Sequence, residues 1–162
     1  MSRISYSDEE DYPGQFDLWQ ANCDRSIEGK KGQAALRELE QALLELPEKK
    51  LIGHKLQDEG GGVCAIGAVV KHRGASVKTT PEDVEEVGIE LGFPRMVAWK
   101  VVCLNDIEVD GRYEQQLDGR HKFIEVTDEE RYCQVLSQVQ KWIKRNLKKQ
   151  QCKHAMMPFS SS

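Results

Sequence analysis

The residues of this chain that are best suited to chemistry surround Cys64. Three glycines, Gly60–Gly62, lead into a run of small apolar residues, Val63–Ala68, with the cysteine near its start. Small residues at the start of a helix indicate that another stretch of backbone comes very close. A thiol at that position also feels the positive end of the helix, which lowers its pKa and makes it more nucleophilic. The segment is therefore either the tightest packing point of a small core or the corner of an active site, and its composition favours packing.

A thiol nucleophile needs a base within hydrogen-bond reach and a third group that orients the base. The candidate bases are His54, His72 and His121, and the candidate orienting groups are Asn105 and Asp106. None of these histidines has the strand-like apolar flanks that would hold an imidazole rigidly. Because a free cysteine among alanines and glycines is typically a small buried hydrophobe, we predict a structural role for Cys64 and no catalytic residues.

The remaining cysteines and histidines do not form a metal-binding pattern. Five cysteines are an odd number, and no two have the C-x-x-C spacing of a zinc site or the paired spacing of a disulfide framework. The histidines show no H-x-x-x-H spacing, and Cys152 with His154 makes no designed site. We therefore expect no metal, no cofactor and five free thiols. Cys152 should be exposed, and the other four, Cys23, Cys64, Cys103 and Cys133, should be buried.

Basic residues gather at two places and are the predicted binding residues. Four lie on the expected C-terminal helix, Lys141, Lys144, Arg145 and Lys148, and three lie earlier, Lys30, Lys31 and Arg37. Cations near a helix C-terminus are also favoured by the helix dipole, so a solvated face is the alternative explanation. The stretch Gly29–Gln33 lacks the preceding strand and the hydroxyl of a phosphate-binding loop, which excludes nucleotide binding there.

The first half of the chain predicts three helices and a short hairpin. One helix opens at Pro13 and places Phe16, Trp19 and Cys23 on one face, and a basic turn between Gly29 and Gly32 follows. The next helix ends at Pro47 and carries the clearest apolar stripe, Ala35, Leu36, Leu39, Ala42, Leu43 and Leu46. Residues 51–63 are predicted as a small β-hairpin, and Cys64–His72 as a buried helix capped by Gly74.

The second half predicts three more helices. Thr80 and Pro81 indicate a helix start, with the helix ending at Gly92. Another helix runs from Pro94 to Asn105-Asp106, which we interpret as its C-cap. The alternative makes Asp106 a buried carboxylate that pairs with an arginine such as Arg131. Thr127 and Glu130 have the spacing of a capping box, opening a helix that runs to about Lys149.

Together these elements predict a mainly α, compact multi-helix single domain with a small β-hairpin. An acidic flexible arm is expected over residues 1–12, the helical domain over 13–149 and a disordered basic tail over 150–162. A polar insert, 107–126, interrupts the domain and has the turn signals of a short hairpin or an extra loop.

Length and charge narrow the class of protein. A chain of 162 residues is long enough for one domain with a real hydrophobic core. A net charge of −4 argues against a molecule that coats nucleic acid with its whole surface. No apolar run approaches the roughly 20 residues that cross a bilayer, and the N-terminus is polar and acidic, so we expect no membrane association and a cytoplasmic location.

Several short segments resemble a family of small, functionally uncharacterised proteins encoded in bacteriophages, prophages and bacterial genomes. The segments are Gly29–Gln33, Leu36–Leu39, Leu46–Ile52, Val63–Ala68, Asn105-Asp106, Glu129–Arg131 and Trp142. The resemblance implies a phage-type accessory protein in the cytoplasm of a bacterial host, and it supplies no catalytic residues. The 107–126 insert and the basic tail are additional to the pattern.

Three functions follow from these observations. The first is a non-catalytic accessory protein that binds a host protein or ribonucleoprotein complex, for example as an inhibitor of a host defence system such as a CRISPR effector. The second is a cysteine-dependent hydrolase that uses Cys64. The third is a nucleic-acid-binding protein that uses the basic C-terminal helix.

Overall fold

The two longest helices form the centre of the molecule. The computed structural model describes residues 14–109 and 111–156. Helix α2 (Lys30–Glu45) and its C-cap Leu46 bury all six residues of the predicted stripe, and α6 (Asp128–Ala155) buries Tyr132, Val135, Val139 and Ile143. The hydroxyl of Tyr132 donates to the carbonyl of Leu43 at 3.0 Å, and the amide of Gln140 donates to Glu40 at 3.0 Å. These two bonds show that α2 and α6 run antiparallel.

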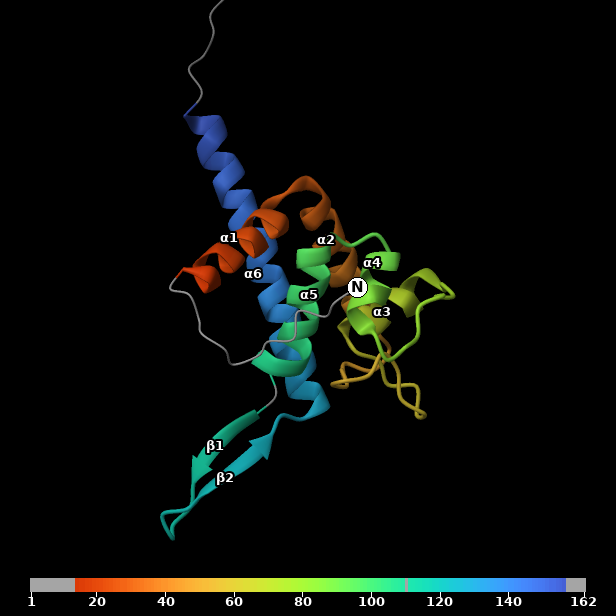
Figure 1. Ribbon diagram of the computed structural model, residues 1–162, viewed down its shortest axis with the longest axis vertical. Helices are drawn as coiled ribbons and strands as arrows, with labels where there is room; N and C mark the ends of the chain where they lie inside the picture. The colour runs from red at the N-terminus through yellow and green to blue at the C-terminus, as the bar shows by residue number, and fades with distance from the viewer. Residues whose placement is uncertain (1–13, 110, 157–162) are drawn as a thin grey trace, which may run out of the picture.

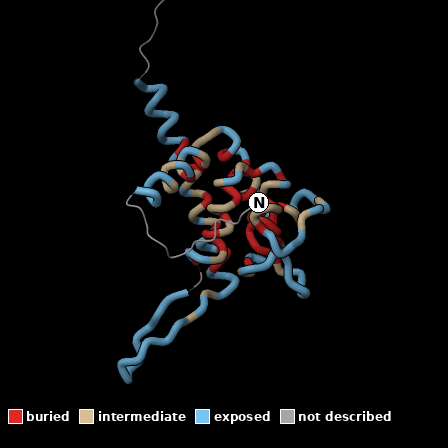
Figure 2. Tube along the Cα trace, in the orientation of Figure 1, coloured by how far each residue is buried: buried red, intermediate tan, exposed pale blue. Residues whose placement is uncertain are grey.

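Three shorter helices lie beside this pair, and α3 (Ala65–Arg73) connects them to α2 (Figure 1). Helix α3 contacts both α2 and α5 (Arg95–Cys103), and α4 (Val84–Glu90) packs on α5. Ala65, Ile66 and Val69 are fully buried, so α3 lies in the middle of the core. Figure 2 shows the buried residues concentrated where these helices meet. The buried helix that the sequence predicts after Cys64 is confirmed.

Helix α1 (Gln15–Glu28) covers one side of the core with only part of its predicted face. Cys23 and Ile27 are buried, and Trp19 stacks edge-on against Trp99 with ring centroids 4.4 Å apart. Phe16 lies at the start of the helix and remains 63% exposed. The predicted stripe therefore reaches the core only from its second turn onward.

The small β-hairpin does not lie at residues 51–63, but in the 107–126 insert, where the turn signals indicated a short hairpin or an extra loop. Strands β1 (Gly111–Gln115) and β2 (His121–Glu125) pair antiparallel and project from the helical body as a separate arm (Figure 1). Residues 51–63 hold only an isolated bridge between Gln57 and Val63, because the glycine-rich chain there turns too tightly for a ladder. The fold class, mainly α with a small hairpin, is confirmed.

Two helix starts differ from the prediction. Lys30 and Lys31 form the first turn of α2 rather than a loop, because extended Gly29 alone connects α1 to α2. Helix α4 begins after Asp83, whose carboxylate accepts the backbone N–H of Glu86 at 3.5 Å. Thr80 instead closes the preceding turn by accepting the N–H of Asp83. Aspartate is as good an N-cap as threonine, so the later cap defines the start.

Helix α6 begins as predicted and ends later. Thr127 and Glu130 form the full capping box. The helix continues through residues 150–155, which contain no glycine or proline to end it, so this part of the predicted disordered tail is helical. The predicted acidic arm, 1–12, and the end of the tail lie outside the described residues. Within the described chain, no helix combines the length and apolar character that spanning a membrane requires.

Candidate functional site

Cys64 is a buried helix cap. It is the N-cap of α3, its sulfur accepts the backbone N–H of Gly67 at 3.4 Å, and the residue is 3% exposed. Burial raises the pKa of the thiol to about 12, which outweighs the opposing N–H bond from Gly67. The expected lowering of this pKa by the helix start is therefore wrong, because desolvation of the thiolate dominates. At neutral pH the thiol is protonated and inert.

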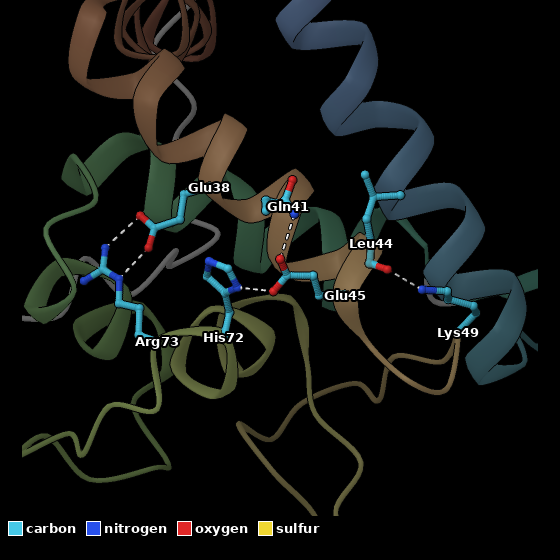
Figure 3. Close-up of polar contacts among 7 residues, drawn as sticks. All are labelled: Glu38, Gln41, Leu44, Glu45, Lys49, His72 and Arg73. Atoms are coloured by element: carbon cyan, nitrogen blue, oxygen red, sulfur yellow. Dashed lines mark hydrogen bonds and ion pairs between the residues drawn. The ribbon is translucent and has the colours of Figure 1, made fainter.

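The three histidines predicted as candidate bases, His54, His72 and His121, form other contacts or lie exposed. His72 lies on α3, and its Nδ1 is 2.5 Å from a carboxylate oxygen of Glu45 on α2 (Figure 3). His121 lies exposed on β2, in the projecting hairpin. His54 is exposed, and its backbone adopts the left-handed conformation with a φ of 63°. Its backbone N–H donates to Asp106 Oδ1 at 2.9 Å. This arrangement does not resemble a thiol–imidazole pair.

Asn105 forms a buried junction of four chain segments. It lies in a short π-helical turn, η1 (Leu104–Glu108), and is 2% exposed. Its side-chain oxygen accepts the N–H of Ala65 at 3.2 Å, and its amide donates to the carbonyl of Ile52 at 2.9 Å and to Asp106 at 2.7 Å. The C-cap interpretation is therefore wrong, because the chain continues as a π-turn and the side chain points into the core.

Arg131 completes this junction from α6. It is 6% exposed, and its guanidinium donates to the backbone carbonyl of Asn105. The α-carbon of Gly53 faces that guanidinium so closely that an added Cβ would lie 3.1 Å from it. A buried arginine held in this way connects α6 to η1 and to the loop after Leu51.

The segments that carry the family resemblance meet at this junction. Leu46–Ile52 supplies a carbonyl, Val63–Ala68 supplies an N–H, Asn105-Asp106 supplies the central amide, and Glu129–Arg131 supplies the guanidinium. The sequence linked Asn105-Asp106 to Arg131 only as an alternative and did not indicate the other bonds, because the junction joins residues 26 to 53 positions apart. With its amide and carbonyl bonded on every side, Asn105 serves to hold the fold together.

The other thiols divide by their position on the helices. Cys23 and Cys103 are buried, whereas Cys133 and Cys152 are exposed on α6. The prediction of a buried Cys133 is wrong, because the residue follows Tyr132 and is rotated about 100° out of the buried stripe. Among the described residues, no three side chains of the metal-binding types gather into a cluster that could hold an ion.

Five of the seven predicted binding residues lie exposed on the outward sides of α2 and α6. The bond between Glu40 and Gln140 marks the seam between α2 and α6. Arg37 lies one turn before Glu40 on α2, and Lys144 lies one turn after Gln140 on α6. Because the helices are antiparallel, both residues are displaced from the Glu40–Gln140 bond in the same direction along the helix axes. Lys30 continues the row on α2, and Lys141 and Lys148 continue the row on α6. All five are exposed, and we call them the basic face.

The other two predicted binding residues lie elsewhere. Arg145 faces α1, where its guanidinium is 3.9 Å from Glu28, a carboxylate that also binds Lys149. Lys31 shares a side of α2 with Glu38, seven residues later, and Glu38 forms a two-pronged ion pair with Arg73 of α3 (Figure 3). Lys31 therefore points toward the α3 side of α2, away from α6.

The projecting hairpin is the surface feature that sequence reasoning did not select. Tyr113 is 73% exposed, and Leu117 at the tip is fully exposed. The rings of Tyr113 and Phe123 pack against each other across the strands with centroids 5.1 Å apart. The aromatic residues Tyr113 and Phe123 each have at least one charged neighbour in sequence, a pattern that indicates a β-strand. The turn residues around them indicated a loop equally well.

Comparisons of the chain with protein-family models, with curated proteins and with solved structures find no match. The structure itself defines a mainly α domain with a buried junction at Asn105, a basic face on α2 and α6, and a projecting hairpin. The resemblance to phage-encoded proteins stays a prediction.

Proposed function

We propose that this chain is a non-catalytic accessory protein that binds a macromolecular complex through the basic face of α2 and α6. The observation that supports the proposal is the exposure of five cations on two antiparallel helices that contact each other, namely Lys30, Arg37, Lys141, Lys144 and Lys148. A buried, protonated Cys64 and a saturated Asn105 junction leave no reactive group at the segment where chemistry was most plausible.

The charge of the basic face is available to a partner. Within the described residues, no carboxylate lies within ion-pair distance of its five cations. Cations elsewhere are neutralised in part, for example Arg73 by Glu38 and Lys100 by Glu108. Cations that form no ion pair with the described residues, on a chain of net charge −4, favour one orientation toward a polyanion.

A ribonucleoprotein complex fits this surface best. The phosphates of the nucleic acid would attract the cations of the basic face. The protein component of the complex would contact the rest of the exposed surface of α2 and α6. The family resemblance extends the proposal to a phage-type protein that acts on a complex of its bacterial host. Inhibition of a defence system such as a CRISPR effector is the specific case to examine.

The proposal is tested by affinity purification from a bacterial lysate with two matched triple variants. The face variant combines Arg37→Glu, Lys144→Glu and Lys148→Glu. The control combines Lys55→Glu, Lys71→Glu and Lys78→Glu, three exposed lysines away from that face, and it changes the net charge equally. We expect the face variant to lose the co-purifying complex and the control to keep it. Equal recovery by both variants would contradict the proposal.

Binding to naked nucleic acid is the second candidate, because the same cations favour it. The affinity for a labelled RNA or DNA fragment would then fall steeply with salt, and the face variant would abolish it. Nuclease treatment of the lysate separates the two cases. A complex that survives the treatment requires a protein component, whereas a naked nucleic acid does not.

A further inference from the structure

Among the described residues, no further strand pairs with the outer backbone edge of β1 or of β2. Tyr113 pairs with Phe123, and the loop between the strands closes through two bonds, from Gln116 N–H to Arg120 O at 2.7 Å and from Gly119 N–H to Gln116 O at 2.9 Å. Gly119 has the positive φ, 82°, that this three-residue loop requires.

The loop bonds fix which backbone groups point outward. Hydrogen-bonded and non-hydrogen-bonded pairs alternate along an antiparallel ladder. The Gln116–Arg120 bond therefore makes Tyr113 and Phe123 a non-hydrogen-bonded pair, which agrees with their close rings. The N–H and C=O groups of Gly111, Tyr113 and Gln115 then face away from β2, along the outer edge of β1.

The side chains of β1 are exposed on both faces. One face carries Tyr113 beside Phe123, and the other carries Arg112 and Glu114, whose charged atoms lie 2.9 Å apart. A ribbon of two strands is marginally stable in water, and an open edge is a template for another strand. The charges of residues 111–125 balance, since three cations, Arg112, Arg120 and Lys122, face three anions, Glu114, Asp118 and Glu125. This balance favours a protein strand over a polyanion.

We propose that the outer edge of β1 pairs with the same edge of a second copy of this chain. The two β1 strands would run antiparallel about a two-fold axis at Tyr113. This register sets Arg112 opposite Glu114 of the partner subunit, and Glu114 opposite Arg112 of the partner subunit. The strand is thus complementary to itself in charge, which a two-fold interface requires.

The outer edge of β2 lacks this complementarity. A two-fold axis at Phe123 would set Lys122 opposite Ile124 of the partner subunit, leaving the lysine without a carboxylate. The β1 pairing instead continues the Tyr113–Phe123 contact into an aromatic row across four strands. It involves neither α2 nor α6, so the dimer is independent of the proposed function.

The experiment is sedimentation equilibrium of the full chain from about 10 μM to about 1 mM. Two strands of five residues make a small interface, so we expect reversible dimers with a Kd on the order of 0.1 mM. Glu114→Arg sets arginines opposite arginines and should weaken the dimer at least about tenfold. The double variant Arg112→Glu with Glu114→Arg restores opposite charges, and its Kd should return to within about threefold of wild type.

Proline substitutions test the edge itself. Gln115→Pro removes an outward N–H of β1 without touching a bond inside the hairpin, so it should weaken the dimer. His121→Pro does the same at the outer edge of β2 and should leave the dimer unchanged. The Tyr113–Phe123 contact, followed by NMR, verifies that each variant keeps the hairpin. A wild-type chain that stays monomeric at 1 mM, a charge swap that fails to restore pairing, or a His121→Pro variant that is weakened as much as Gln115→Pro would overturn the proposal.

Discussion

Gly67 is the residue at which α3 comes closest to the chain that precedes it. A Cβ at this position would lie under 3.0 Å from the carbonyl oxygen of Leu56 and 3.0 Å from the Cβ of Val63. The Leu56 carbonyl also accepts the N–H of Cys64 at 3.1 Å, so it is held in place from the other side. A side chain at position 67 therefore has to displace backbone rather than a flexible side chain.

Replacing Gly67 by leucine should destabilise the protein by about 1–3 kcal/mol through overpacking. Urea unfolding followed by circular dichroism measures the change. Gly60→Ala is the matched control, because a Cβ at Gly60 meets only the carboxylate of Asp58 at an ordinary 3.5 Å. That control should stay within about 0.5 kcal/mol of wild type. A leucine variant as stable as wild type would show that α3 is not confined as described.

The raised pKa of Cys64 gives a second outcome at the residue scale. A buried, protonated thiol reacts only when the protein opens, whereas Cys133 and Cys152 are exposed on α6. Treatment with iodoacetamide near pH 7.5, followed by mass spectrometry, should modify Cys133 and Cys152 first and Cys64 only after denaturation. Rapid alkylation of Cys64 in the folded protein would instead support the cysteine-dependent hydrolase.

At the scale of elements, the Asn105 junction connects parts that do not neighbour each other in sequence. The π-turn η1, the start of α3, the chain at Ile52 and the first turn of α6 all meet there. The buried polar groups of this junction bond to one another, so the loss of one member leaves others unsatisfied. The junction sets how α6 lies against the α3–α5 layer.

Asn105→Ala should therefore destabilise the protein by at least about 2 kcal/mol, because the N–H of Ala65 and the carbonyl of Ile52 each lose a buried partner. Chemical denaturation gives the free energy of unfolding. The control is Asn22→Ala, because Asn22 is an exposed residue of α1. This variant should change the free energy of unfolding by less than about 0.5 kcal/mol. Equal stability of both variants would mean that water replaces the amide without cost.

The helices were predictable from the sequence to the extent that their signals are local. The apolar stripe of α2 and the capping box of α6 depend on residues within two turns, and both are confirmed. The hairpin was placed at residues 51–63 because the glycines there imitate a turn between strands. In the 107–126 insert the turn signals indicated a hairpin or a loop, and a ribbon without a buried face gave too little apolar alternation to decide between them. The sequence singled out Asn105 and Arg131 but not their bond to each other, because their partners are fixed only by the tertiary fold.

The predicted binding residues show the same division between local and tertiary information. Spacing alone placed Lys141, Lys144 and Lys148 on one side of a helix. Spacing could not show that α2, which carries Arg37, runs antiparallel to α6, nor that Arg145 is turned toward Glu28. Such contacts depend on how two helices pack, which a single sequence pattern does not encode.

At the scale of the whole molecule, charge is divided between contacts that hold the fold and a face that is free to bind. Glu38 and Glu45 of α2 pair with Arg73 and His72 of α3 and fasten these two helices at the surface (Figure 3). The opposite side of α2 carries Arg37 and turns toward α6. Helix α2 thus stabilises the fold on one side and presents cations on the other.

This division predicts how stability depends on pH. The hydrogen bonds from Arg73 hold the pKa of Glu38 below its ordinary value, and bonds from Gln41 and His72 lower that of Glu45. A carboxylate whose pKa is lower in the folded state adds stability above the pKa of the unfolded chain, and this stability is lost as the pH falls toward the folded-state pKa. The Tm of wild type should therefore decrease as the pH falls from about 5 to about 3.

Removal of one of these carboxylates tests the assignment. Glu38→Gln should lower the Tm at pH 6, where the ion pair with Arg73 is present, and should flatten the decrease at low pH, so that the two curves converge near pH 3. Thermal unfolding by circular dichroism across this range provides the comparison. Glu82→Gln is the control, because Glu82 is exposed and forms no ion pair within the described residues, and its curve should run parallel to wild type. If the Glu38→Gln curve also runs parallel, the loss of stability in acid arises from other carboxylates, and the fastening of α2 to α3 contributes little to it.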